Sequence, residues 1–184
     1  METLVARYHL HPIIDHFTIA LLSIGVLVDI AGSALTGSLG DRWPSLTGLG
    51  VRLRAAAPVL LIPGAISALF SRLTGEIEAD RIWDALSPGA QQILFSDAGL
   101  APFLSHAELG SYLMYVFGAL AAWRVLLEVW TKLKGTQLVY FTFAFIALCA
   151  LLYQGKTGGE LVYEHAAGTS RLDITSAQHA NAQK

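Results

Sequence analysis

The chain has 184 residues, of which 54% are hydrophobic and only 14% are charged. This composition is too apolar for an ordinary soluble domain of this length and predicts an integral membrane protein. The formal net charge of -2, without any Arg-rich segment, argues against nucleic acid as a partner. The single cysteine, Cys149, excludes an intramolecular disulfide, a cysteine-based zinc site and the CxxCH attachment of a c-type haem.

Four segments are long and apolar enough to cross a hydrocarbon core, which requires about 20 helical residues. They are residues 13–35, 55–73, 107–129 and 138–154. We therefore expect an all-α, integral membrane four-helix bundle over residues 1–168 and a polar C-terminal tail over residues 169–184. The linker between the second and third spans is expected to contain short amphipathic helices at the membrane interface.

The positive charges near the span ends predict the orientation in the membrane. The two loops that join spans one and two, and spans three and four, carry Arg42, Arg52, Arg54, Lys132 and Lys134. Positively charged loops face the cytoplasm, so both termini and the long linker are expected outside, in a bacterial inner membrane. Five of the six histidines then lie on the outer side, namely His9, His11, His16, His106 and His165.

These histidines suggest a cofactor site near the outer face. A histidine in the first turn of a helix is kept neutral by the helix dipole, and a neutral imidazole can bind a metal ion or a haem iron. We expect His16 and His106 as the axial pair of a haem b, with His165 as substitute and His11 as a weaker candidate. Two alternatives stay open. The first is a transition-metal site formed by His16, His106, His165, Glu76 and Glu160. The second is a set of interfacial histidines that only form hydrogen bonds and bind no cofactor.

The chain also reads as two similar hairpins. The first runs from "DHF" to "LTGEIEAD", and the second runs from "SHAELG" to "KTGGELVYEH". A duplication would place His16 opposite His106 and Glu76 opposite Glu160, around an axis along the membrane normal. The alternative is that the Thr-Gly words merely end helices, because glycine is common at helix C-termini.

Asp29 is the one acid well inside a predicted span. Carboxylates within the membrane are functional by default, but three arginines lie near the same inner face. We favour an ion pair of Asp29 with Arg52, Arg54 or Arg124 as the explanation.

Four stretches of the chain resemble, in order and spacing, the predicted membrane proteins of domain-of-unknown-function family 2231. These stretches are "HLHPIIDHFTIALLSIGVLVDI", "ALFSRLTGEIEAD", "HAELGSYLMYVFGALAAW" and "GGELVYEHAAG". The sequence departs from the family pattern at Thr18, where proline is more usual, and at "HAAG", where "HGVG" is more usual. Relatives that look fused to Rieske or c-type cytochrome domains imply a role near electron transfer at the outer face.

Taken together, these features predict a subunit of a membrane redox assembly rather than a self-contained enzyme. Its expected partners are the lipid bilayer and other membrane redox subunits or c-type cytochromes. The competing hypothesis is a cofactor-free structural subunit of a larger membrane complex. A role in binding metals or handling ions is third.

Overall fold

Four long helices dominate the computed structural model, which describes residues 10–95 and 105–167. They are α2 (Leu10–Thr36), α4 (Thr47–Ile82), α6 (His106–Val129) and α7 (Gln137–Tyr163). Each of the four lies in a helical segment long and apolar enough to cross a membrane, and no strand occurs in the described parts of the chain. The predicted all-α membrane bundle is therefore confirmed. The predicted tail, residues 169–184, lies outside the described residues.

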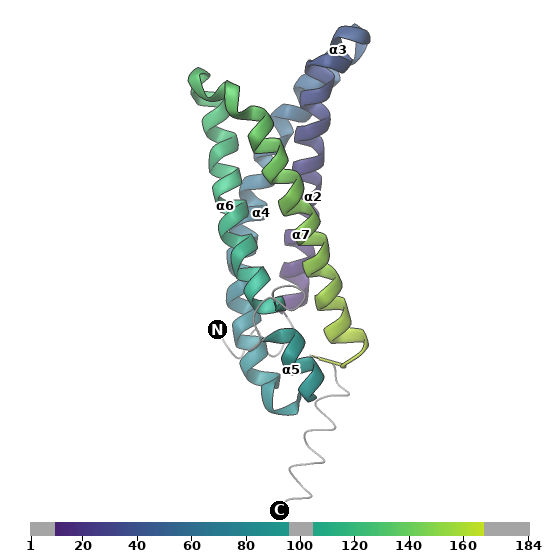
Figure 1. Ribbon diagram of the computed structural model, residues 1–184, viewed down its shortest axis with the longest axis vertical. Coiled ribbons are helices and arrows are strands. Elements are labelled where there is room, and N and C mark those ends of the chain that lie inside the picture. The colour runs from purple at the N-terminus through teal and green to yellow at the C-terminus, as the bar shows by residue number, and fades with distance from the viewer. Residues whose placement is uncertain (1–9, 96–104, 168–184) are drawn as a thin grey trace, which may run out of the picture.

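Short helices connect the long ones. Helix α3 (Ser38–Arg42) and the 3-10 turn η1 (Pro44–Leu46) join α2 to α4, while η3 (Thr131–Thr136) joins α6 to α7. At the other end, η2 (Trp83–Ala85) and α5 (Pro88–Leu94) follow α4 (Figure 1). These two elements are the short helices expected in the linker. Helix α5 begins there because the Ser87 hydroxyl accepts a hydrogen bond from the Ala90 amide and Pro88 occupies the first turn.

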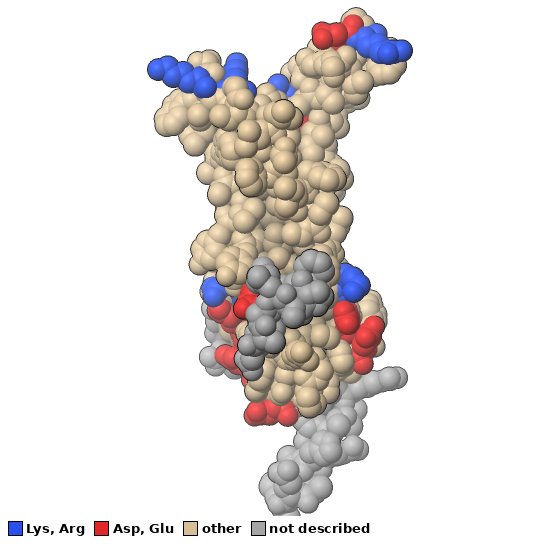
Figure 2. Space-filling view, viewed as in Figure 1, with Lys and Arg blue, Asp and Glu red and all other residues tan. Residues whose placement is uncertain are grey.

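The helices form a ring in the order α2, α4, α6, α7, and the start of α2 and the end of α7 lie at the same end (Figure 1). Charge divides the two ends, with Lys and Arg gathered at one and most Asp and Glu at the other (Figure 2). We name them the cationic end and the acidic end. The cationic end carries Arg42, Arg52, Lys132 and Lys134. The acidic end carries Glu76, Asp80, Asp84, Glu160 and Glu164.

The pattern of buried positions repeats between the two hairpins. The buried residues of α2 are Thr18, Leu22, Gly25, Val26, Asp29 and Gly32. A shift of 95 positions, the interval from His11 to His106, places every one of them on a buried residue of α6, namely Leu113, Phe117, Leu120, Ala121, Arg124 and Leu127. Such agreement supports a duplication but corrects its register, since the counterpart of His106 is His11 rather than His16.

The second helices of the hairpins repeat in the same way. Here the shift is 83 positions, the interval from Thr74 to Thr157. It carries seven buried residues of α4 onto buried residues of α7. The matched pairs are Ala57 with Tyr140, Leu61 with Ala144, Gly64 with Ala147, Ala68 with Leu151, Ser71 with Gln154, Thr74 with Thr157 and Glu78 with Leu161. In this register Glu76 corresponds to Gly159, so Glu76 and Glu160 are not the matched pair that the sequence suggested.

Helices α2 and α4 pack more closely than α6 and α7, and glycine explains the difference. A Cβ at Gly32 would lie 2.7 Å from the backbone nitrogen of Arg54. A Cβ at Gly64 would lie 2.6 Å from a methyl group of Leu22. The second hairpin has leucine and alanine at the positions equivalent to Gly32 and Gly64. Its helices therefore lack glycine at these two positions, where glycine lets α2 and α4 approach closely.

Candidate functional site

His106 begins α6 and is buried at the acidic end, where α6 meets α7. The helix starts here because Ser105 and Glu108 form a capping box, each side chain bonding the backbone of the other. Nδ1 of His106 lies 3.0 Å from the Thr157 hydroxyl, which donates its own proton to the Gln154 carbonyl at 3.0 Å. Thr157 must therefore accept a proton from Nδ1, and this fixes the tautomer that leaves a lone pair on Nε2.

The lone pair on Nε2 of His106 faces the side-chain amide of Gln154. The amide nitrogen lies 3.3 Å from Nε2 and also donates to the His106 carbonyl at 2.9 Å. On the other side the ring packs against Gly158, where a Cβ would lie 3.0 Å from Cε1. Oε1 of Gln154 is buried and finds no hydrogen-bond partner among the described residues. This oxygen is an acceptor that an ordered water molecule or a ligand donor would satisfy.

His11 makes the equivalent contacts in the first hairpin. Its Nδ1 lies 3.0 Å from the Ser71 carbonyl and 3.4 Å from the Thr74 hydroxyl. Because a carbonyl oxygen can only accept, the proton of His11 is also on Nδ1 and the lone pair is on Nε2. The ring packs against Gly75, where a Cβ would lie 2.9 Å from Cε1. A histidine, a threonine and the next glycine thus form the same unit twice.

The two Thr-Gly pairs, Thr74–Gly75 and Thr157–Gly158, contact the histidines and do not end helices. Helix α4 continues from Thr74 and Gly75 to Ile82, and α7 continues beyond Gly158 to Tyr163. The alternative that these glycines are helix stops is therefore wrong. Each glycine removes a side chain that would otherwise occupy the place of a histidine ring.

The two units differ at Asp15, whose equivalent is Gly110, and at Ser71, whose equivalent is Gln154. Asp15 accepts a hydrogen bond from the Ser71 hydroxyl at 3.0 Å, and it lies within electrostatic range of His106, as does His11. The equivalent position in the second hairpin is Gly110. A Cβ there would lie 3.0 Å from the Gln154 amide nitrogen, so the glutamine occupies the space beside this glycine. The first unit is therefore acidic, whereas the second is uncharged apart from its histidine.

The other predicted histidines lie elsewhere. His16 is exposed on α2, with Nδ1 only 2.6 Å from the Pro12 carbonyl of its own helix. His165 contacts the Ser87 hydroxyl at the start of α5, at 3.3 Å. His9 lies outside the described residues. The structure therefore does not bring His16 and His106 together, because the rotation of α2 directs His11 inward in place of His16.

The predicted glutamate ligands are engaged in ion pairs along their own helices. Glu76 lies 2.5 Å from Arg72, and Glu160 lies 3.8 Å from Lys156. Within residues 10–95 and 105–167, no three His, Cys, Asp or Glu residues are placed to hold a metal ion. The predicted metal set of His16, His106, His165, Glu76 and Glu160 is thus dispersed in this arrangement.

A haem b can be tested against the two buried units. Axial ligation requires an Nε2 lone pair, with Nδ1–H held by another group, and both His11 and His106 meet this requirement. Space is the obstacle, because the Gln154 amide covers Nε2 of His106. The residues present do not fit a haem unless this glutamine moves away.

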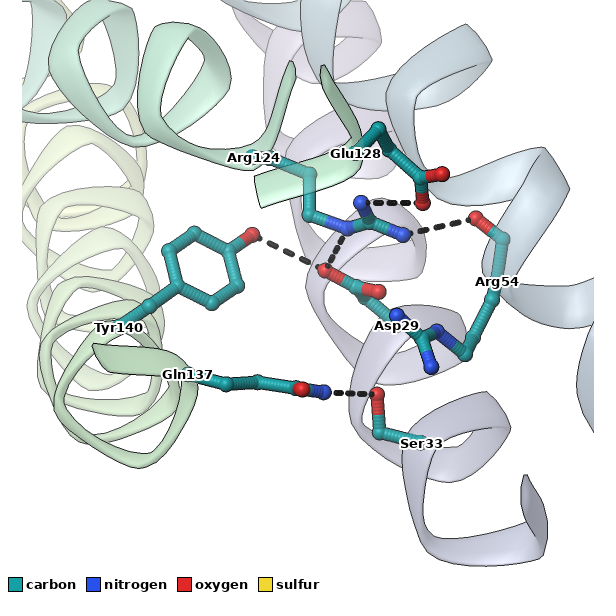
Figure 3. Close-up of polar contacts among 7 residues, drawn as sticks. All are labelled: Asp29, Ser33, Arg54, Arg124, Glu128, Gln137 and Tyr140. Carbon is teal, nitrogen blue, oxygen red and sulfur yellow. Dashed lines mark hydrogen bonds and ion pairs between the residues drawn. The ribbon is translucent and has the colours of Figure 1, made fainter. Parts of the chain in front are cut away.

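A second polar cluster lies in the bundle toward the cationic end, and it contains the predicted ion pair (Figure 3). Nε of Arg124 donates to Oδ2 of Asp29 at 2.6 Å, and both side chains are almost fully buried, with exposed fractions of 2% and 1%. The same carboxylate oxygen accepts from the Tyr140 hydroxyl at 3.1 Å. Arg124 also donates to Glu128 at 2.7 Å and to the Arg54 carbonyl at 3.1 Å. The predicted pairing of Asp29 with an arginine is confirmed, and Arg124 is the partner.

This ion pair joins the two hairpins at equivalent positions, because Asp29 and Arg124 are 95 residues apart. A hydrogen bond of 3.0 Å from Gln137 to Ser33 joins the hairpins nearby (Figure 3). Sequence reasoning missed the partners of His106, which are Gln154 and Thr157. A signal for Thr157 was present in the sequence, because Thr157–Gly158 repeats Thr74–Gly75. It becomes informative when His106 is matched with His11, 95 positions earlier, rather than with His16, 90 positions earlier.

Comparison with known proteins gives one match. The family model described as "Predicted membrane protein (DUF2231)" covers residues 7–171. No curated protein and no solved structure matches the chain.

Proposed function

The chain belongs to the DUF2231 family of predicted membrane proteins, and we propose that it is a subunit of a larger membrane electron-transfer assembly that docks a positively charged partner. The electron-transfer class comes from the resemblance described above. The docking role is supported by the shape and charge of the acidic end. In this proposal the acidic end faces outward and the cationic end faces the cytoplasm, following the positive-inside rule.

The observation that carries the docking role is the length of α4, whose end is too long to lie within the lipid. We use the name headpiece for the end of α4, η2, α5 and the end of α7, which pack together. Helix α4 has 36 residues, and a helix of that length spans about 54 Å, whereas a hydrocarbon core is about 30 Å thick. The last turns of α4 carry Arg72, Glu76, Glu78, Asp80 and Arg81, which place them in water. The headpiece has its own core, formed by Ala79, Ile82, Leu86, Ala90, Leu94, Leu161 and Ala167.

The surface of this headpiece is suited to a basic partner. Glu76, Asp80, Asp84 and Glu164 are exposed on it, and Tyr163, which precedes Glu164 in the chain, is 90% exposed. Complementary charge steers a partner toward its docking site, and exposed aromatic residues are common in interfaces. A membrane redox subunit or a c-type cytochrome with a basic surface matches this chemistry.

Neutralising three exposed acids tests the docking role. We expect Asp80→Asn, Asp84→Asn and Glu164→Gln together to weaken the assembly, because they remove negative charge without touching the headpiece core. The measurement is the mass of the particle that contains this chain, by size-exclusion chromatography with light scattering after mild detergent extraction at increasing salt. The triple variant should dissociate at lower salt than the wild type.

Asp41→Asn is the control, since it removes an exposed carboxylate from the opposite end. It should leave the particle intact. A wild-type chain that elutes alone even at low salt would rule the proposal out.

A haem b subunit of the same class of assembly is the second candidate, and one observation favours it. His11 and His106 both keep their Nε2 lone pairs because Nδ1 is held by an acceptor. These two residues would hold the iron, which would supply reversible one-electron transfer. Gln154 would have to release Nε2 of His106.

This candidate predicts a Soret band in protein purified from cells supplied with haem. His11→Ala and His106→Ala should abolish the band, His16→Ala should preserve it, and Gln154→Ala should increase haem occupancy. The absorption spectrum and an iron analysis of the same sample are the measurements. Colourless protein without iron would exclude haem, and another bound transition metal would indicate a bare metal site.

A further inference from the structure

Four cations at the cationic end pair with no acid in the described ranges, residues 10–95 and 105–167. Arg42, Arg52, Lys132 and Lys134 are exposed and form no ion pair within the described part of the chain. The acidic end differs, because its described cations are all paired. These pairs are Arg72 with Glu76, Arg81 with Glu78, and Lys156 with Glu160. We propose that the cationic end binds the phosphate headgroups of anionic phospholipids.

The cations of this end are divided between two arms. The hairpins are tied together by the Asp29–Arg124 ion pair and the Gln137–Ser33 hydrogen bond, and beyond this level they diverge (Figure 1). Lys and Arg side chains gather on both diverging arms, with a notch between them (Figure 2). Each arm therefore offers cations to phosphate headgroups at this end of the bundle.

Each arm contributes two of the four exposed cations. On the first hairpin, Arg42 ends α3 and Arg52 lies in the first turns of α4. On the second hairpin, Lys132 and Lys134 lie in the connecting turn η3. Glu128, the nearest acid on the second arm, is engaged by Arg124 at 2.7 Å. On the first arm, Asp41 is a single carboxylate beside two arginines.

Aromatic and apolar neighbours identify the ligand as a lipid rather than a soluble phosphate. Trp43 and Trp130 are about half exposed at this end, with exposed fractions of 49% and 58%, and Arg42 lies 5.4 Å from the centre of the Trp43 ring. Tryptophan at such positions lies at the level of lipid headgroups. Val51, Val129 and Leu138 are also exposed here and would contact acyl chains.

An anionic headgroup is favoured over a zwitterionic one by charge. Phosphatidylcholine carries its own cation beside the phosphate, whereas phosphatidylglycerol carries a net negative charge. Each Lys or Arg near the headgroup is expected to contribute roughly fivefold to the affinity for an anionic lipid. Removing two cations should therefore reduce the preference by about 25-fold.

The test is a lipid titration of the purified full chain in detergent, followed by native mass spectrometry. Phosphatidylglycerol and phosphatidylcholine are compared for the wild type, for Arg42→Gln with Arg52→Gln, and for Lys132→Gln with Lys134→Gln. The matched control is Arg72→Gln with Lys156→Gln, which removes the same charge from the acidic end. Circular dichroism checks that every variant keeps its helical content, and a further arm adds inorganic phosphate as competitor.

We expect the wild type to retain phosphatidylglycerol preferentially, each variant pair of the cationic end to lose this preference, and the control to keep it. Three results would overturn the proposal. One is equal retention of both lipids by the wild type. Another is an equal loss in the control, which would indicate an effect of net charge alone. The third is displacement of the lipid by equimolar inorganic phosphate, which would indicate a site for soluble phosphate.

Discussion

Replacing Arg124 by methionine is expected to destabilise the bundle by about 3–5 kcal/mol, because the substitution leaves Asp29 buried without its charge partner. Asp29→Asn should cost less, since Arg124 keeps its bonds to Glu128 and to the Arg54 carbonyl. The double variant Asp29→Leu with Arg124→Met should recover much of the loss, because no unpaired charge stays buried. The measurement is the thermal unfolding midpoint in detergent, followed by circular dichroism.

Glu128→Gln is the control for this series. Its side chain is about half exposed, so its ion pair with the same arginine should contribute less than about 1 kcal/mol. If Glu128→Gln and Arg124→Met lowered the midpoint equally, the buried pair would not be the main tie between the hairpins.

The second large loss of stability is expected when a single methyl group is added at Gly32. Gly32→Ala should destabilise the protein by about 3 kcal/mol, at the upper end for overpacking, because the new Cβ would lie 2.7 Å from the Arg54 nitrogen and 2.9 Å from the Gly50 carbonyl oxygen. Both neighbours are backbone atoms, so relief requires α2 and α4 to separate. A thermal unfolding series in the same detergent provides the measurement.

Gly118→Ala is the matched control, because it makes the same chemical change at another membrane-level helix position. Apart from its chain neighbours and the backbone of its own helix, no atom of the described residues lies within 4 Å of its added Cβ. Alanine also has a helix propensity about 1 kcal/mol better than glycine. The control should therefore be neutral or stabilising. A similar loss in both variants would contradict the close approach of α2 and α4.

Hydropathy was sufficient to predict the four spans, but it underestimated the helices. The second span was predicted over residues 55–73, whereas α4 covers Thr47–Ile82. The additional turns carry charged residues that a lipid environment excludes, yet these residues are good helix formers in water. Hydropathy identifies only the part of a helix that lies in the hydrocarbon core, and the helix can continue beyond the membrane.

The histidine site was only partly predictable, for a geometric reason. His11 and His16 are five positions apart, so about 140° around the helix separates them, and only one can face the bundle. The sequence favoured His16 because it begins the apolar run. Which one faces inward depends on the rotation of α2, and that rotation is set by the close contact of Gly25 and Gly32 with α4. Such a contact between helices is not visible in the pattern of one helix.

The ion pair between the hairpins has a consequence for assembly. Asp29 and Arg124 occupy equivalent positions of a duplicated hairpin, beside the axis that relates the two copies. If two first hairpins from neighbouring chains paired about that axis, two aspartates would meet in the membrane interior. Two second hairpins would bring two arginines together. Like charges at close range are costly, so only unlike hairpins can pair. The ion pair therefore favours pairing of the first hairpin with the second over pairing of either hairpin with a copy of itself.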